Sequence, residues 1–336
     1  MSSATSPSMN KARANAGVRH SLRATMPFNL ENRLVIGVAS SAMFDLSDSD
    51  AVFRREGEEE YRKFQQQHLE TPLKKGIAFS FIKRLLSLND LCDTPVENPL
   101  IEVILLSRND PDTGLRVMKS IQHHGLAISR AIFMQGKAPY EFIPALNISL
   151  FLSGNKDDVN AAIQRGFPAG YVMHSTMVDD EKDEDLRIAF DFDGVLADDE
   201  SEQVFQARKD VNDFHQHETR HVGLPHGPGP LKEFLVRISK IQSVEELRKR
   251  SDPSYRNRLR VSIVTARNAP SHERALNTLK SWGVMTNDAF FLGGIQKSRV
   301  LEILQPHIFF DDQPGHLTEA AKVVPSVHIP FGAINR

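Results

Sequence analysis

The segment that most constrains the fold is Arg187–Leu196, in which an apolar run ends in Asp191-Phe192-Asp193-Gly194. An apolar run bounded by a glycine predicts a buried β-strand that leads into a sharp turn. Because alternate residues of a strand point to the same side, Asp191 and Asp193 are expected to face one point beyond its carboxyl end. Open parallel α/β sheets bind their ligands at that edge, so the segment predicts an α/β fold with a site there.

Two carboxylates held so close together repel each other and perturb each other's pKa unless a cation lies between them. The ion expected to bind there is a hard divalent cation that prefers oxygen ligands, most simply Mg²⁺. The alternative interpretation is a solvated acidic loop without chemistry. The short pattern Asp191-Phe192-Asp193-Gly194 does not decide between the two.

Three later segments place further polar side chains at the ends of predicted elements. A second apolar strand ends in the hydroxyl of Thr265, Lys297 opens a predicted helix after a Gly-Gly turn, and another strand stops at the pair Asp311-Asp312. Taken singly, Thr265 could be a strand cap and Lys297 a surface lysine. Taken together with two acid pairs, they favour one phosphate-binding site.

This order of acid pair, hydroxyl, amine and second acid pair resembles the haloacid-dehalogenase-like phosphatase superfamily. More narrowly, the chain resembles the cytosolic 5′-nucleotidases of type I, through the acidic run at residues 198–202, the Gly-Pro-Gly-Pro-Leu segment at 227–231 and the layout from about residue 32 onward. Phe192 is a departure, since animal members place glycine between the two aspartates. The departure leaves the phosphatase chemistry untouched and the choice of nucleotide open.

The resemblance implies Mg²⁺-dependent hydrolysis of a nucleoside 5′-monophosphate, with AMP favoured, through an aspartyl-phosphate intermediate. Asp191 would be the nucleophile, and Asp193 would act first as general acid and then as general base. Mg²⁺ would be held by Asp191, the backbone carbonyl of Asp193, and Asp311, with Asp312 acting through water in an outer layer.

The phosphate would be bound by Thr265, Ala266 and Lys297, which supply a hydroxyl, the strand-end backbone and a fixed positive charge. Arg267 and Asn268, just past this strand end, are further candidates for substrate contact. The base needs an aromatic or apolar slot, for which the sequence offers candidates that it cannot distinguish from core residues. These candidates are Phe44, Phe205 and Phe214.

Composition limits the classes of function. A net charge of −2 without a basic block argues against nucleic-acid binding, and no apolar run approaches the length of a membrane span. Cys92 is the single cysteine, which fits a reducing, cytoplasmic compartment. A small-molecule nucleotide is the expected partner, and a homo-oligomer is left open. The alternatives are a phosphatase of another small ester, such as a sugar phosphate, and a non-catalytic nucleotide-binding regulatory protein.

The sequence contains an internal repeat that covers most of the chain. The Arg-Asn-x-Pro and Phe-x-x-Gly patterns recur at offsets of 159 and 158 residues, which suggests a duplication. We therefore predict two tandem doubly wound, Rossmann-like halves with parallel sheets and helical cap insertions. The predicted parts are a disordered tail at 1–30, with a transit peptide as alternative, a degenerate first half at 31–180 with an insertion at 47–98, and a catalytic half at 181–336 with a cap insertion at 198–258.

The alignment of the halves predicts that the first has lost the chemistry. Its positions for nucleophile, acid, hydroxyl and metal ligand are Ala39, Ser41, Leu106 and Ser153. Only Lys137, set against Lys297, keeps its type. The first half is thus expected to support the site without transferring phosphate.

Overall fold

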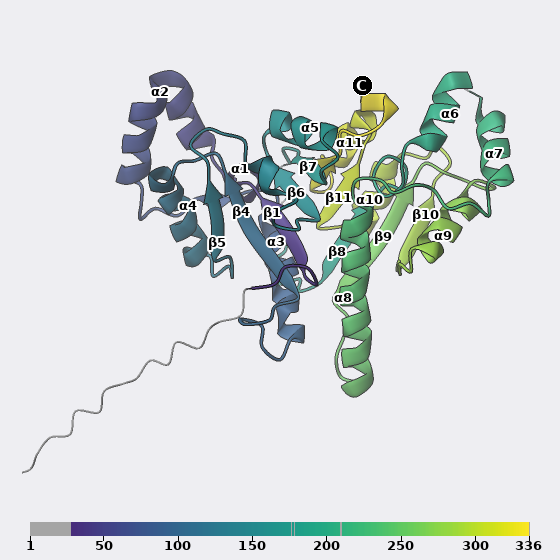
Figure 1. The fold of residues 1–336 in the computed structure, drawn as a ribbon, viewed down its shortest axis with the longest axis horizontal. Coiled ribbons are helices and arrows are strands. Elements are labelled where there is room, and N and C mark those ends of the chain that lie inside the picture. The colour runs from purple at the N-terminus through teal and green to yellow at the C-terminus, as the bar shows by residue number, and fades with distance from the viewer. Residues whose placement is uncertain (1–27, 176, 178, 209, 336) are drawn as a thin grey trace, which may run out of the picture.

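The computed structural model describes residues 28–335 except 176, 178 and 209, and omits the side chains of Phe205 and Arg208. Residues 1–27, most of the predicted tail, lie outside this described part. The backbone forms a ten-stranded sheet with helices packed on it, and a separate pair of two-residue strands (Figure 1).

The first half contributes five parallel strands in the order β5-β4-β1-β6-β7. The inner strands are rich in Ile, Leu, Val and Phe, as strands buried on both faces must be. The five strands are β1 (Leu34–Val38), β4 (Ile101–Ser107), β5 (Arg130–Phe133), β6 (Leu150–Ser153) and β7 (Ala169–Val172).

The second half repeats this order as β10-β9-β8-β11-β12, again parallel. An antiparallel pair, β7 with β12, joins the two halves edge to edge into one continuous sheet. The predicted α/β fold with parallel strands is confirmed. The strands of the second half are β8 (Leu186–Phe190), β9 (Leu259–Thr265), β10 (Asp288–Phe291), β11 (Ile308–Asp311) and β12 (Ser326–His328).

Helices connect the parallel strands. In the first half α4 (Pro111–His123) follows its N-cap residue Asp110, whose carboxylate accepts hydrogen bonds from the backbone N–H groups of Asp112 and Thr113, and Pro111 is its first residue. The connecting helices are α1 (Ser40–Met43), α4 (Pro111–His123), η2 (Pro139–Phe142), α5 (Lys156–Gln164), α9 (His272–Ser281), α10 (Lys297–Leu304), α11 (Pro314–Ala320) and the C-terminal η3 (Ala333–Asn335).

Each half carries an insertion after its first strand, and Figure 1 shows α2 and the α6–α7 pair in the upper part of the view, at opposite ends of the molecule. The first insertion contains β2 (Phe44–Asp45), α2 (Ser47–Gln67), β3 (Lys74–Lys75), α3 (Phe79–Ser87) and η1 (Leu88–Leu91). The second contains α6 (Glu200–Arg208), α7 (Val211–Arg220) and α8 (Lys232–Ser251).

One helix of each insertion packs on a strand of the other half. α3 of the first half packs on β8 of the second, and α8 of the second packs on β1 of the first. Polar contacts fasten both helices: Arg84 forms an ion pair with Asp179 at 2.8 Å, and Arg237 donates to the backbone carbonyl of Glu31 at 3.1 Å. The two halves therefore share both a sheet and its covering helices.

The strand register corrects one position of the alignment between the halves. Leu34 pairs with Ile101 and Leu186 pairs with Leu259, so β4 and β9 correspond residue for residue. The counterpart of Thr265 is consequently Ser107, and the assignment to Leu106 is wrong. The reason is that the loop after β4 is one residue shorter than the loop after β9, which shifted the Arg-Asn-x-Pro match.

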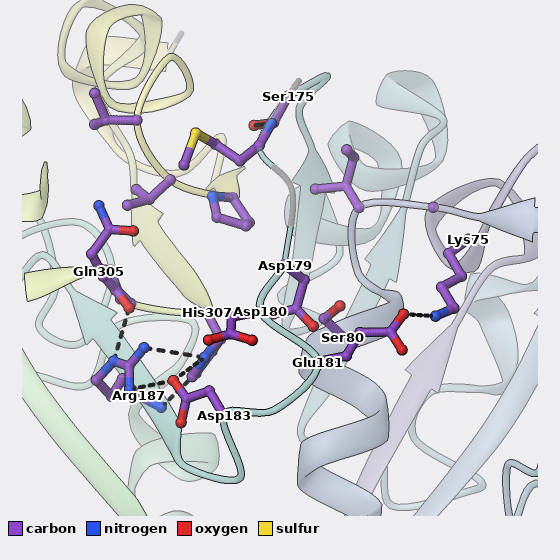
Figure 2. A pocket seen from close by; sticks show the side chains of 17 residues that line it. Lys75, Ser80, Ser175, Asp179, Asp180, Glu181, Asp183, Arg187, Gln305 and His307 are labelled. Atoms are coloured by element: carbon purple, nitrogen blue, oxygen red, sulfur yellow. Dashed lines mark hydrogen bonds and ion pairs between the residues drawn. The ribbon is translucent and has the colours of Figure 1, made fainter.

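A cavity of about 450 Å³ lies between the halves at the starts of β8 and β11, the ends opposite to Asp191 and Asp311 (Figure 2). Two ion pairs form between charged side chains that line it. Lys75 bonds Glu181, and Arg187 lies 2.7 Å from Asp183. His307 on its wall is buried, and burial together with the nearby Arg84 and Arg187 lowers its pKa to about 4.

His307 should make the fold sensitive to acid. Its pKa is lower in the folded chain than in the unfolded one, so its contribution to stability is complete above the ordinary histidine value and is lost as the pH falls toward 4. In His307→Gln the free energy of unfolding, measured by urea titration between pH 6.5 and 4, should fall less steeply, by up to about 1.4 kcal/mol per pH unit. The exposed His123→Gln serves as control and should keep the wild-type slope.

Candidate active site

The predicted site residues meet at the carboxyl ends of three neighbouring strands. Asp191 follows β8, Thr265 ends β9 and Asp311 ends β11. A cavity of about 400 Å³ opens there, and Lys297, the first residue of α10, is buried beside it. The side chains that line it come from both sheet and cap: Asp191, Asp193, Glu202, Gln206, Val211, Phe214, His215, Thr265, Ala266, Arg267, Asn268, Gly293, Gly294, Gln313, His316 and Ile334.

Lys297 links the two acid pairs. Its Nζ lies 2.9 Å from Asp191 Oδ2 and 2.7 Å from Asp311 Oδ2, and all three side chains are at most 4% exposed. Burial alone would lower the pKa of Lys297, but the two carboxylates outweigh it and raise the pKa above its usual value. The ammonium is therefore a fixed positive charge beneath the cavity.

The buried carboxylates exceed the positive charge available to them. Burial and the neighbouring Asp191 and Asp311 raise the pKa of Asp312 to about 10. Burial raises the pKa of Asp191 to about 6 even though Lys297 opposes the shift. With all three carboxylates ionised against one ammonium, the formal charge is −2, which matches one divalent cation.

The donor set fits such a cation. Asp191, Asp311 and His316 each offer one atom, and these atoms lie within 4.8 Å of one another. Asp312 Oδ1 is buried and has no hydrogen-bond partner among the described residues, so it could accept from a water bound to the ion. Carboxylate oxygens are the ligands that Mg²⁺ prefers, whereas His316, which the sequence analysis did not single out, is a less usual one.

Gly194 lets the turn after Asp193 pass close to Asp312. Its φ is +70°, and a Cβ at this position would lie 2.4 Å from Asp312 Oδ2. Glycine adopts positive φ without the steric cost that a side chain brings. The turn therefore requires glycine for its conformation and for its space.

Gly194→Ala should destabilise the fold and reduce activity together, because the methyl group displaces Asp312 from the acid cluster. We expect a loss of about 1–3 kcal/mol in the free energy of unfolding. Gly125→Ala is a matched control, since Gly125 has φ +68° and open space around it. A loss no larger than that of the control, measured by urea denaturation, would contradict the proposed clash.

Arg267 binds both oxygens of Asp193. Its Nε lies 2.7 Å from Oδ2 and its Nη2 lies 2.6 Å from Oδ1, in a nearly fully buried guanidinium. From the sequence, Arg267 is expected only to contact substrate, whereas the structure places it on the predicted general acid. The predicted general acid is thus held in place by two hydrogen bonds from one guanidinium.

The same guanidinium holds the cap. Arg267 forms an ion pair with Glu218 of α7, which is fully buried, and its Nη2 donates to Ser201 of α6 at 2.9 Å. Glu218 also binds Arg274 of α9 at 3.0 Å. The residue types of α7 gave no signal for Glu218, because an acid in a polar helix usually faces solvent. The cap and the predicted acid are therefore joined through one buried ion network.

The three aromatic candidates for base binding differ in their location in the structure. Phe214 lines the cavity and lies 5.5 Å from the Arg267 guanidinium. Phe44 is wrong as a candidate, because it is buried in the first half against Phe79. The side chain of Phe205 lies outside the described residues.

The corresponding place in the first half is occupied by hydroxyls that bond each other. Ser40 Oγ lies 3.1 Å from Ser107 Oγ, and Ser41 Oγ accepts from the backbone N–H of Gly154 at 3.2 Å. Lys137 is exposed on the loop after β5, in contrast to the buried Lys297. This half brings no carboxylate to the positions of Asp191 and Asp193, which Ala39 and Ser41 fill.

Two comparisons place the chain among known proteins. The family model described as 5′-nucleotidase matches residues 26–336. Human cytosolic 5′-nucleotidase 1B is 34% identical over 303 residues, which cover 87% of this chain and 48% of the human protein. The chain thus spans about half the length of the curated relative. Among the described helices, none has the length and apolar character to cross a bilayer.

Proposed function

Because the chain belongs to the 5′-nucleotidase family, we propose that it hydrolyses nucleoside 5′-monophosphates to nucleoside and phosphate in the cavity beside Asp191. The observation that carries the proposal is the convergence of Asp191, Asp311 and Lys297, buried and within ion-pair distance, at the floor of a cavity that a cap covers. AMP, favoured by the resemblance, is the first substrate to test. The cytoplasm, where the human relative's name places that protein, is the proposed location.

The reaction would proceed in two displacements. A carboxylate oxygen of Asp191 attacks phosphorus, the bond from phosphorus to the 5′-oxygen breaks, and Asp193 gives that oxygen a proton. Asp193 then takes a proton from water, whose oxygen attacks the phosphoaspartate and releases Asp191. The two hydrogen bonds from Arg267 would hold the carboxyl group of Asp193 in place for both proton transfers.

The remaining residues would hold the transferring group. Thr265 donates its hydroxyl and Ala266 its backbone N–H to phosphoryl oxygens, while Lys297 supplies positive charge. Asp191, Asp311 and the backbone carbonyl of Asp193 would hold Mg²⁺, with Asp312 binding through water. Bound there, Mg²⁺ offsets the repulsion between the attacking carboxylate and the phosphate.

The proposal is tested by measuring phosphate release from a set of nucleotides and sugar phosphates, each with and without Mg²⁺. Mg²⁺-dependent release from nucleoside 5′-monophosphates is the expected result. Preference for sugar phosphates would assign the site to another ester. Binding of nucleotides without any release would indicate a regulatory protein.

Removing the metal or one of its ligands should weaken activity in a way that added Mg²⁺ reverses. In Asp311→Asn the Mg²⁺ concentration at half-maximal activity should rise by about tenfold or more, since a neutral amide is a poorer ligand for a hard cation. Asp288→Asn, in a surface pair with Arg260, is the control and should not change it. Hydrolysis that continues undiminished in excess EDTA would rule out the metal.

A further inference from the structure

We infer that the cap contains a second cation site, formed by Asp198, Glu200 and His226, which takes a divalent transition metal such as Zn²⁺. The three residues belong to the loop after β8, the start of α6 and the loop before α8. They share no residue with the group at Asp191, and one atom from each lies within 4.8 Å of the other two. The site is therefore distinct from the one that the hydrolysis needs.

The distances suit ligands of one ion better than hydrogen bonds. His226 Nδ1 lies 3.9 Å from Asp198 Oδ1 and 4.0 Å from Glu200 Oε2. Both separations exceed the range of a hydrogen bond. Two ligands at about 2 Å from a common metal ion lie up to about 4 Å apart, as these do.

His226 directs an unpartnered nitrogen at the two carboxylates. Its side chain is 0% exposed, and neither Nδ1 nor Asp198 Oδ1 has a hydrogen-bond partner in the described part of the chain. A buried polar atom left without a partner costs about 1–3 kcal/mol. A cation between the three side chains would satisfy both atoms at once.

The other nitrogen of His226 lies against one acid and one base of the ion network. Nε2 lies 3.3 Å from Glu218 Oε2 and 3.2 Å from Arg267 Nη2. The two hydrogens of this Nη2 are already used, by Asp193 Oδ1 and by Ser201 Oγ. With a cation bound to Nδ1, the proton of the imidazole would sit on Nε2, from which it can be donated to Glu218 Oε2. Histidines that bind metals usually donate their other N–H to a carboxylate in this way.

The ion network around these three residues carries more negative than positive charge. Four carboxylates, those of Asp193, Asp198, Glu200 and Glu218, face only two guanidiniums, those of Arg267 and Arg274. The formal balance is −2, which one divalent ion neutralises. An imidazole among carboxylates favours Zn²⁺, Co²⁺ or Mn²⁺ over Mg²⁺ and Ca²⁺, which take oxygen ligands.

A metal bound here would hold the cap in place. It would tie the first residue of α6 to the loop at His226, and Glu218 would connect it to Arg267 and so to Asp193. The occupied site would keep the cap in the arrangement in which Arg267 binds both oxygens of Asp193. Its role is thus structural, or regulatory through Asp193.

Co²⁺ is a suitable probe, because its visible absorption reports nitrogen ligands and geometry. The metal-free full chain, in excess Mg²⁺, should bind one equivalent of Co²⁺ by equilibrium dialysis and develop visible absorption bands. His226→Gln should weaken Co²⁺ binding by at least about 100-fold, and Glu218→Gln by about 10- to 100-fold. Asp191→Asn should leave Co²⁺ binding unchanged, which separates this site from the proposed hydrolysis.

His221→Gln is the matched control, since His221 lies in the same cap and its Nδ1 bonds the backbone carbonyl of His217. It should bind Co²⁺ as the wild type does. If His226→Gln does not fold, Asp198→Asn, on a partly exposed loop residue, tests the same ligand set. The inference is overturned if the wild type binds no Co²⁺ in the presence of Mg²⁺, or if the ligand variants bind it as tightly as the wild type.

Discussion

Asp191→Asn should reduce phosphate release on the order of 10⁴-fold or more while leaving the fold intact. An amide fills the volume of the carboxylate but cannot attack phosphorus, so the covalent step is lost. Single-turnover kinetics with a phosphate-release probe would measure the chemical step. Circular dichroism and thermal unfolding would show that the chain is folded.

The first half supplies the control for this variant. Asp45, the acid nearest in sequence to the position that corresponds to Asp191, is exposed and accepts a hydrogen bond from the backbone N–H of Ser47, the first residue of α2. Asp45→Asn should therefore leave the rate of the chemical step near the wild-type value. If Asp191→Asn kept more than a tenth of the wild-type rate, the assignment of the nucleophile would be wrong.

Lys297→Met should have the second largest effect, and it should act on stability and rate together. Without the ammonium, Asp191 and Asp311 are buried as like charges, and breaking a buried ion pair typically costs about 3–5 kcal/mol. The rate of hydrolysis should fall by about 10²- to 10³-fold, the usual cost of removing one group that stabilises transition-state charge.

A stability measurement and a control variant test whether the losses come from the missing positive charge beside Asp191 and Asp311. Urea denaturation with and without Mg²⁺ should show that the metal restores part of the lost stability, because it binds the folded form and offsets the same carboxylates. Lys137→Met removes the corresponding but exposed lysine of the first half and should change neither quantity much. Equal losses in the two variants would mean that the buried position of Lys297 has no special role.

The strands and the residues at their ends could be predicted because both signals are local. Apolar runs give the strands, and Asp191, Thr265 and Asp311 follow directly from where those runs stop. The position of Ser107 was missed for an equally local reason, since a one-residue difference in a loop moved a motif out of the strand register. Pattern matching in loops does not report the register of the strands before them.

The ion network could not be predicted, because it depends on contacts between segments far apart in sequence. Glu218 and His226 face Arg267 only because α7 and the loop before α8 fold back over the end of β9. In the sequence the same residues lie in a polar region that reads as solvent-exposed. Likewise, the sequence does not distinguish Phe44 from Phe214. Tertiary packing alone places Phe44 in a core and Phe214 at the cavity.

The antiparallel pair of β7 and β12 has a consequence for any shortened form of this protein. A second half produced alone would expose the backbone N–H and C=O groups of β12 along an open sheet edge, and the face of β8 that α3 covers would lie bare. Open edges of this kind pair readily with other chains and start aggregation. The first half, whose β7 pairs with β12, therefore shields this edge from pairing with other chains.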